Sequence, residues 1–150
     1  MGQQDFIALL GKHRLVALDT CCFIYHFEAN RRYLPLTRLL FRRIEEGAIS
    51  AVTSSITLTE LLTGPKRLGN DALAQEYEEL LAIFPNLEIV PVDWEIAARA
   101  ADFRAEFALR TPDALQLATA VCKGATLFVS NDQRFKRVKG IGIALLDDYL

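Results

Sequence analysis

Metal-binding and disulfide-forming side chains are scarce in this chain. It has only two histidines, His13 and His26, and three cysteines, Cys21, Cys22 and Cys122. The odd cysteine count and the absence of any Cys-x-x-Cys or His–Cys spacing argue against a disulfide framework and against a structural zinc site. We therefore expect the cysteines to be small buried residues.

Long hydrophobic stretches are also missing. No run of about 18 uncharged apolar residues occurs, and the first residues have no basic region followed by an apolar segment and a cleavage site. We therefore expect a cytoplasmic protein with no membrane partner. The 150 residues, 51% of them hydrophobic, suit one globular domain over residues 1–150. Residues 1–13 would be an extension or a short helix before the first strand.

The net charge is small and gives no overall attraction to a polyanion. It is −2 at pH 7, which does not favour an avid, non-specific nucleic-acid binder. Basic side chains nevertheless gather at Arg31-Arg32, Arg38-Arg42-Arg43, Lys66-Arg67 and Arg134-Lys136-Arg137-Lys139. Each cluster taken alone is better explained as an ordinary solvated helix face.

Short apolar runs alternate with longer segments of helical periodicity. Strands are expected at Leu15–Leu18, Ile49–Thr53, Leu87–Val90, Thr126–Val129 and Ile143–Leu146. Helices are expected at Ser54–Leu62, Leu34–Glu46, Asp71–Phe84, Asp93–Phe107 and Pro112–Cys122, with Ser54 or Ser55, Asn70 and Thr111 as N-caps. The nearly continuous apolar strands predict an open α/β sheet covered on both faces, with ligands at the carboxyl ends of the strands. The segment Thr63–Gly69 is expected to be the most mobile loop.

Two acidic residues directly follow expected strands. Asp19 comes after Leu15–Leu18, and Asp132 comes two residues after Ser130, at the end of another strand. Both would lie at the carboxyl edge of the sheet. Each also has a purely structural interpretation, because Asp19 could cap a helix and Asp132 could form a turn or a cap.

Two further acidic residues lie on expected helices. Glu60 is four residues after Ile56, so an inward-packed Ile56 would carry Glu60 toward the core, where an unpaired charge is costly. Asp113 lies in the first turn of a helix that is almost wholly apolar or small, which places it at the edge of the core. A salt-bridged Glu60 at the rim and an Asp113 that stabilises the helix start are the alternatives.

Together the four carboxylates could converge in one cleft. Four such charges would repel strongly in a partly desolvated pocket, and a hard divalent cation with oxygen ligands is the simplest way to hold them together. Mg²⁺ or Mn²⁺ is the expected ion, because a zinc site would use histidine and cysteine.

Four ordered segments of the chain resemble those of the PIN-domain nucleases, most closely the VapC-type toxins of bacterial toxin–antitoxin pairs. The segments are Leu18–Thr20, Leu58–Leu62, Thr111–Ala118 and Ser130–Phe135. Each motif is weak singly, but their order and spacing are strong in combination and span nearly the whole chain. The chain departs from the family at Cys21, where Asn or Ser is common, and in the dozen residues before the first strand.

This resemblance implies a three-layer α/β fold with a five-stranded parallel sheet in the order 3-2-1-4-5. It also implies hydrolysis of RNA phosphodiester bonds at a site where Mg²⁺ or Mn²⁺ is bound. The implied catalytic metal ligands are Asp19, Glu60, Asp113 and Asp132, with Thr20 and Asn131 as supporting polar residues. Basic residues expected near the mouth of that site, and hence candidates for RNA phosphate contacts, are Lys66, Arg67, Arg134 and Lys136.

The resemblance to VapC-type toxins implies protein partners as well. The resemblance predicts a homodimer held inactive by a small antitoxin whose tail lies across the active-site groove. A self-association or antitoxin surface could include Phe23, Tyr25, Phe27, Tyr33 and Leu34, although the sequence favours a buried core stripe as the role of any one of them.

Two other functions compete with the ribonuclease hypothesis. The first is a catalytically silent PIN-like module for RNA binding or assembly, which retention of all four acids disfavours. The second is a phosphohydrolase with Asp19 as covalent nucleophile. Such enzymes usually need a second Asp two positions on, where this chain has Cys21.

Overall fold

Five parallel strands form the centre of the molecule in the computed structural model, which describes all residues from Met1 to Leu150. The strands are β1 (Leu15–Leu18), β2 (Ser50–Ser54), β3 (Leu87–Val90), β4 (Leu127–Ser130) and β5 (Gly142–Leu145). Their order is β3-β2-β1-β4-β5, with every neighbouring pair parallel. The expected sheet order is therefore confirmed, although β2, β4 and β5 are each displaced by one residue from the predicted bounds.

Seven α-helices and two short 3₁₀-helices surround this sheet. They are α1 (Gln3–Leu10), α2 (Thr20–Phe27), α3 (Leu34–Glu45), α4 (Ile56–Arg67), α5 (Asp71–Ile83), α6 (Trp94–Phe107), α7 (Thr111–Cys122), η1 (Gln133–Arg137) and η2 (Leu146–Tyr149). The longest, α6, has 14 residues. No helix combines the length and the apolar composition needed to cross a membrane.

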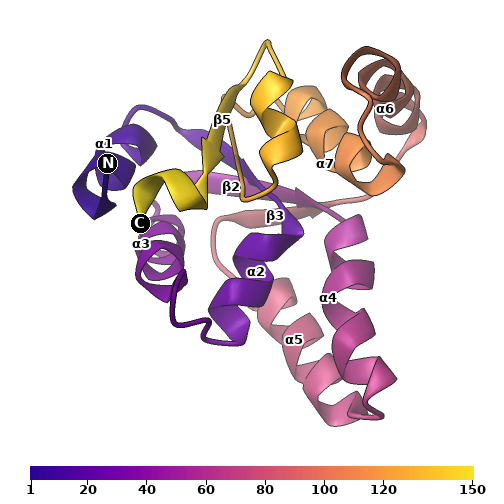
Figure 1. The fold of residues 1–150 in the computed structure, drawn as a ribbon. Helices are drawn as coiled ribbons and strands as arrows, with labels where there is room; N and C mark the ends of the chain where they lie inside the picture. The colour runs from indigo at the N-terminus through magenta and orange to yellow at the C-terminus, as the bar shows by residue number, and fades with distance from the viewer.

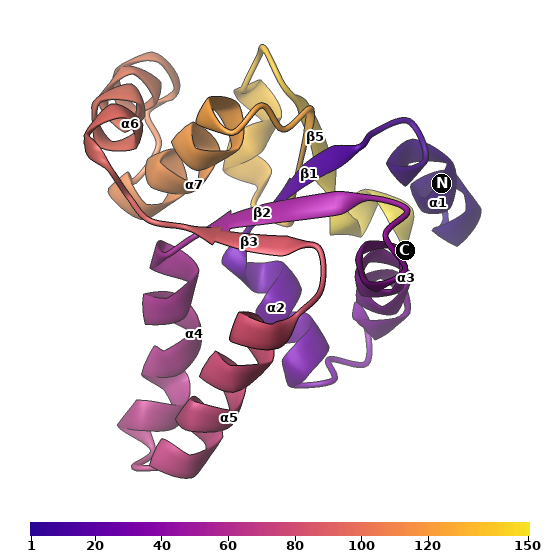
Figure 2. The ribbon, with the colours of Figure 1, turned by 180° about the vertical axis from the view of Figure 1, so that it is seen from behind.

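The sheet separates two hydrophobic cores and so makes the middle layer of three. One core lies against α1 to α5, and the other against α6 and α7 (Figures 1 and 2). Successive residues of β1 alternate between them: Val16 and Leu18 enter the first core, and Ala17 enters the second. This alternation is the two-residue period of a strand, and burial on both faces explains why the strands are almost continuously apolar.

The residues before the first strand were expected to be either an extension or a short helix. They form the short helix α1. Phe6 and Leu10 of α1 are fully buried in the larger core. The ring of Phe6 lies 5.2 Å from that of Tyr149, so α1 packs against the C-terminal η2. Figures 1 and 2 show the two chain ends on the same side of the molecule. The N-terminal segment is thus part of the packed fold.

The prediction of a loop at Thr63–Gly69 is wrong. Helix α4 continues through Gly64 and Pro65 to Arg67, and a turn at Leu68 and Gly69 leads into α5. Proline is costly inside a helix because it removes one backbone hydrogen bond. Here its ring is buried where α4 packs on α5, and the turn after it is held by a bond from the Leu68 N–H to the Gly64 carbonyl at 3.3 Å. Packing in this projecting hairpin (Figures 1 and 2) therefore overrides the local signal.

Helix starts agree with the sequence to within one or two residues. Asn70 caps α5 as predicted, and its side chain accepts a hydrogen bond from the Leu73 N–H at 3.1 Å. Helix α7 begins at Thr111, with Arg110 rather than Thr111 in the N-cap position. That shift of one residue matters because it brings the Arg110 side chain to the first turn of α7.

Candidate functional site

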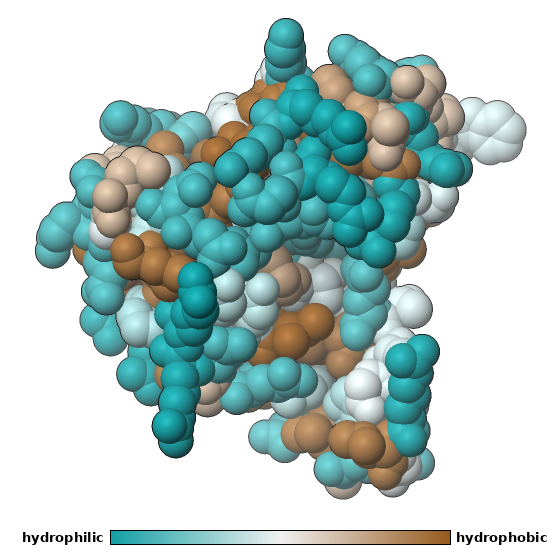
Figure 3. Space-filling view, viewed as in Figure 1, coloured by the Kyte–Doolittle hydropathy of each residue, from teal (hydrophilic) through white to brown (hydrophobic).

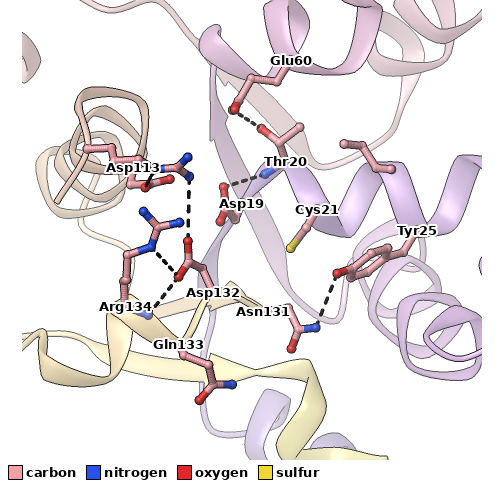
Figure 4. Close-up of a pocket in the computed structure, with 12 residues that line it drawn as sticks. Asp19, Thr20, Cys21, Tyr25, Glu60, Asp113, Asn131, Asp132, Gln133 and Arg134 are labelled. Carbon is pink, nitrogen blue, oxygen red and sulfur yellow. Dashed lines mark hydrogen bonds and ion pairs between the residues drawn. The ribbon is translucent and has the colours of Figure 1, made fainter. Parts of the chain in front are cut away.

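A pocket of about 700 Å³ opens at the carboxyl edge of the sheet. All four acidic residues singled out by the sequence line it, and Figure 4 shows them around one opening. They come from separate elements: Asp19 follows β1, Glu60 belongs to α4, Asp113 to the first turn of α7, and Asp132 precedes η1. Parallel strands all end at the same edge of the sheet. Helix α7 starts at that edge because it returns the chain to the opposite edge, where β4 begins.

Asp19 is buried and held from two sides. Its Oδ1 accepts a hydrogen bond from the Thr20 N–H at 2.8 Å, and its Oδ2 accepts one from the Ser130 hydroxyl at 2.7 Å. The pKa of Asp19 is raised from 3.8 to about 6, mainly by burial and to a smaller extent by the negative charges of Asp113 and Glu60, despite the opposing effect of these two bonds. The residue is both the N-cap of α2 and, with Asp113, one of the two buried carboxylates of the pocket.

Thr20 connects Asp19 to Glu60. Its backbone N–H contacts Asp19, and its hydroxyl donates to Glu60 Oε1 at 2.8 Å. The hydroxyl itself accepts a bond from the buried Gln116 side-chain amide at 3.2 Å, and the same amide donates to Thr57 at 2.9 Å. A buried polar network therefore orients the carboxylate of Glu60 through Thr20.

Gln116 and Thr57 are members of this network that the sequence reasoning missed. Gln116 is 2% exposed and its carbonyl oxygen also accepts the Ser54 N–H at 3.3 Å. A sequence signal was present, because Gln116 is the most polar side chain among the apolar residues that follow Asp113 in α7. Buried amides need partners, so a glutamine on that face indicated a polar neighbour across the core.

Glu60 lies farther out than expected. The residue is exposed, whereas the next residue, Leu61, is 3% exposed and takes the core-facing position of α4. Ile56 is only half-buried, so it does not carry Glu60 inward. The expectation of a core-side Glu60 is therefore wrong, and the carboxylate lies at the rim, where Thr20 holds it.

Two arginines neutralise the other two acids. Arg110 Nε lies 2.9 Å from Asp113 Oδ2, and its Nη2 lies 3.9 Å from Asp132 Oδ2. Arg134 contacts Asp132 through both its backbone N–H, at 2.9 Å, and its Nε, at 3.1 Å. The sequence reasoning missed Arg110. The available signal was its position three residues before Asp113, the spacing at which side chains meet in the first turn of a helix.

Asn131 lines the pocket without touching the acids. Its Nδ2 donates to the Tyr25 hydroxyl at 3.4 Å, and its Oδ1 accepts from the Asp147 N–H at 2.8 Å. Tyr25 and Cys21 also line the pocket. Cys21 and Cys122 are half-buried rather than buried, and Cys22 alone fits the expectation made for the cysteines.

The expected basic residues divide into two groups. Arg134 lines the acidic pocket, but Lys66, Arg67 and Lys136 do not. Lys66 lies at the far end of α4, in a separate hollow that it shares with acidic α5 residues such as Glu78. Lys136 is exposed on η1. The expectation that Lys66 and Arg67 lie near the mouth does not agree with this arrangement, because the extended α4 carries them away from it.

The donor set of the pocket fits a hard divalent cation. Its acidic groups are all carboxylates, and Asp113 Oδ1 and Glu60 Oε2 accept no hydrogen bond from the protein. Both residues line the pocket, so these oxygens are available to a ligand there. No three acidic, histidine or cysteine side chains are drawn together closely enough to hold an ion in the present geometry. Arg110 and Arg134 balance the charge instead.

A sequence model of the family described as PIN domain matches residues 16–141. The chain belongs to the PIN domain family. The match begins in β1 and ends just before β5, so it contains Asp19, Glu60, Asp113 and Asp132. A search of curated proteins gives no match.

Solved structures with the same PIN fold come from bacterial toxin–antitoxin complexes. A DNA-bound VapBC from Salmonella typhimurium is 24% identical with a TM-score of 0.69, covering 89% of this chain and 98% of that one. A toxin–antitoxin complex from Klebsiella pneumoniae is 23% identical with a TM-score of 0.66, covering 87% and 97%. VapBC-5 from Mycobacterium tuberculosis is 22% identical with a TM-score of 0.59, covering 87% and 98%. At these identities the comparison establishes the common fold.

Proposed function

We propose that this PIN domain is a Mg²⁺- or Mn²⁺-dependent ribonuclease and the toxin of a VapBC-like pair. The observation that carries the proposal is the meeting of Asp19, Glu60, Asp113 and Asp132, from four separate elements, in one pocket. Any one of them has a structural explanation as a cap or a surface acid. Capping does not explain why all four face the same opening, since like charges held together are unfavourable without a counter-ion.

In this proposal each carboxylate is a metal ligand with a defined support. Ser130 and the Thr20 N–H fix Asp19, and the Thr20 hydroxyl fixes Glu60. The four carboxylates would hold a divalent ion, which would lower the pKa of a water and offset charge that develops on the phosphate during hydrolysis. The protein itself orients the carboxylate oxygens of Asp19 and Glu60 through the bonds to Thr20 and Ser130.

Metal-dependent RNA cleavage is the direct test. The purified chain should cleave RNA in Mg²⁺ or Mn²⁺ and lose that activity in excess EDTA, because the pocket offers only hard oxygen ligands. Restoring Mg²⁺ in excess over EDTA should restore cleavage. Full activity in EDTA would contradict the proposal. Absence of cleavage on a varied set of RNAs would instead favour a silent PIN module, a function compatible with the arginine-neutralised acids.

Arg134 and Lys136 are proposed to contact RNA phosphates. Reversing both charges (Arg134→Glu with Lys136→Glu) should weaken RNA binding about tenfold or more at low salt and should flatten the salt dependence by about 1.4 in log–log slope. Fluorescence anisotropy in EDTA measures this without cleavage. The matched control is Lys66→Glu with Arg67→Glu, which removes the same charge away from the pocket. Equal losses in both pairs would return Arg134 and Lys136 to the status of ordinary surface charges.

The protein partners in the proposal are a second copy of the chain and a small antitoxin. The structural neighbours that are toxin–antitoxin complexes support this, as does a hydrophobic surface between α2 and the α4–α5 hairpin (Figure 3). Phe23 is 1% exposed and belongs to the core, so it is not available for such contacts. Phe27, Tyr33 and Leu34 are half-buried and remain candidates, whereas Tyr25 lines the acidic pocket.

A further inference from the structure

Arg110 joins two acids that belong to different elements. Asp113 lies in α7 and Asp132 begins η1, and Arg110 reaches both, at 2.9 Å and 3.9 Å. Figure 4 shows Asp113 and Asp132 on the same side of the opening. An arginine that served only to stabilise the start of α7 needs the first contact but not the second. The second contact makes the guanidinium a counter-ion for the pocket itself.

The side chains of Arg110 and Asp113 differ in how freely they can move. The Arg110 side chain is 60% exposed, whereas that of Asp113 is 9% exposed. The carboxylate is therefore held in place by the fold, while the guanidinium can move into solvent on a long, flexible side chain. Arg110 is also the only cation that contacts Asp113, through the Oδ2 oxygen. A divalent ion shared by Asp113 and Asp132 would lie next to this guanidinium and repel it.

We propose that Arg110 competes with the divalent cation for Asp113 and Asp132 and is displaced when the cation binds. Arg110 then acts as a built-in counter-ion that keeps the acidic pocket together without metal and lowers the affinity for metal. The inference rests on the proposed metal-dependent function, since it takes these acids as metal ligands. It adds a residue that tunes metal occupancy without being a ligand.

Isothermal titration of the full chain with Mn²⁺ tests this inference. Arg110→Gln should bind Mn²⁺ at least fivefold more tightly than the parent. Arg67→Gln, which removes the same charge at the end of α4 outside the pocket, should leave the affinity unchanged. In thermal melts Arg110→Gln should melt lower than the parent in EDTA, because the carboxylates repel without their counter-ion, and should gain more from Mn²⁺.

A measurement on the unaltered protein covers the case in which Arg110→Gln does not fold. The Arg110 Nε–H signal in ¹⁵N NMR should shift on addition of Mg²⁺ and exchange faster with water, since the bond to Asp113 is lost. Equal Mn²⁺ affinity in Arg110→Gln and Arg67→Gln, or an Nε–H signal indifferent to saturating Mg²⁺, overturns the inference while the metal site stands. Failure of every variant and of the parent to bind Mn²⁺ overturns the proposed function together with it.

Discussion

Asp113→Asn is expected to lower Mg²⁺-dependent RNA cleavage by about 100-fold or more while the fold is retained. The change keeps the side-chain volume and one carbonyl oxygen, but it removes a negative charge from the proposed metal site. Only the Arg110 pair is lost locally, and because Arg110 is largely exposed, that loss is worth about 1 kcal/mol or less. Weaker repulsion of Asp19 offsets part of it.

Thermal melts separate this role from a structural one. In Mg²⁺ the parent should melt higher than in EDTA, because an ion that binds only the folded state stabilises it, and Asp113→Asn should gain much less. If Asp113 only stabilised the start of α7, the variant would lose a little stability equally in both conditions and would still cleave. Near-parental cleavage by the variant would remove Asp113 from the set of metal ligands.

The matched control for this substitution is Asp93→Asn. Asp93 is also an acid at a helix start, where its Oδ1 accepts the Ile96 N–H at 2.9 Å, but it does not line the acidic pocket. It should therefore show only the small loss typical of a weakened helix cap. Cleavage and the Mg²⁺ response of the melt should be those of the parent.

The second large effect concerns stability against pH in the absence of divalent cations. The pKa of Asp19 is about 6 in the folded protein and near 3.8 when unfolded. Between these values the folded state holds a proton that the unfolded state releases. The contribution of Asp19 to stability therefore improves as the pH falls through 6 and is complete below 3.8. The shift corresponds to something on the order of 3 kcal/mol.

Urea unfolding of the parent and of Asp19→Asn in EDTA measures this contribution. The free energy of unfolding of the parent, relative to the variant, should rise by roughly 2 kcal/mol between pH 7.5 and pH 4.5. Asn at this position cannot accept the Ser130 hydroxyl at the former Oδ2, a loss of about 1 kcal/mol that is independent of pH. Only the difference in slope is therefore diagnostic. Parallel pH profiles for the two proteins would contradict the prediction that ionised Asp19 destabilises the folded state.

The pH prediction describes one buried charge, that of Asp19, which opposes folding when no cation compensates it. No ion pair compensates the charge of the buried Asp19, because the arginines contact Asp113 and Asp132 instead. Unfavourable electrostatics at one position in an otherwise well-packed domain are typical of functional sites. The stability is supplied elsewhere, by the two cores on either side of the sheet.

Local patterns in the sequence determined much of this fold. Strand positions were predicted from buried apolar runs. Such a run stays recognisable when its predicted bounds are wrong by one residue, because both faces of the sheet are covered and both sets of side chains are apolar. The placement of Asp19 and Asp132 at the pocket followed directly, since any residue just after a parallel strand lies at the same edge. The resemblance to PIN domains supplied the strand order, which periodicity alone does not determine.

The tertiary structure decided which side chains meet. Packing between α4 and α5 extended the helix through Gly64 and Pro65 against their local preference and moved Lys66 away from the pocket. The partners of Arg110 and Gln116 lie in distant segments: Arg110 reaches Asp132 and Gln116 reaches Thr20. Such contacts depend on how helices are rotated against the sheet. A single sequence records the periodicity of each helix, but the energy that sets its rotation comes from the neighbours against which it packs.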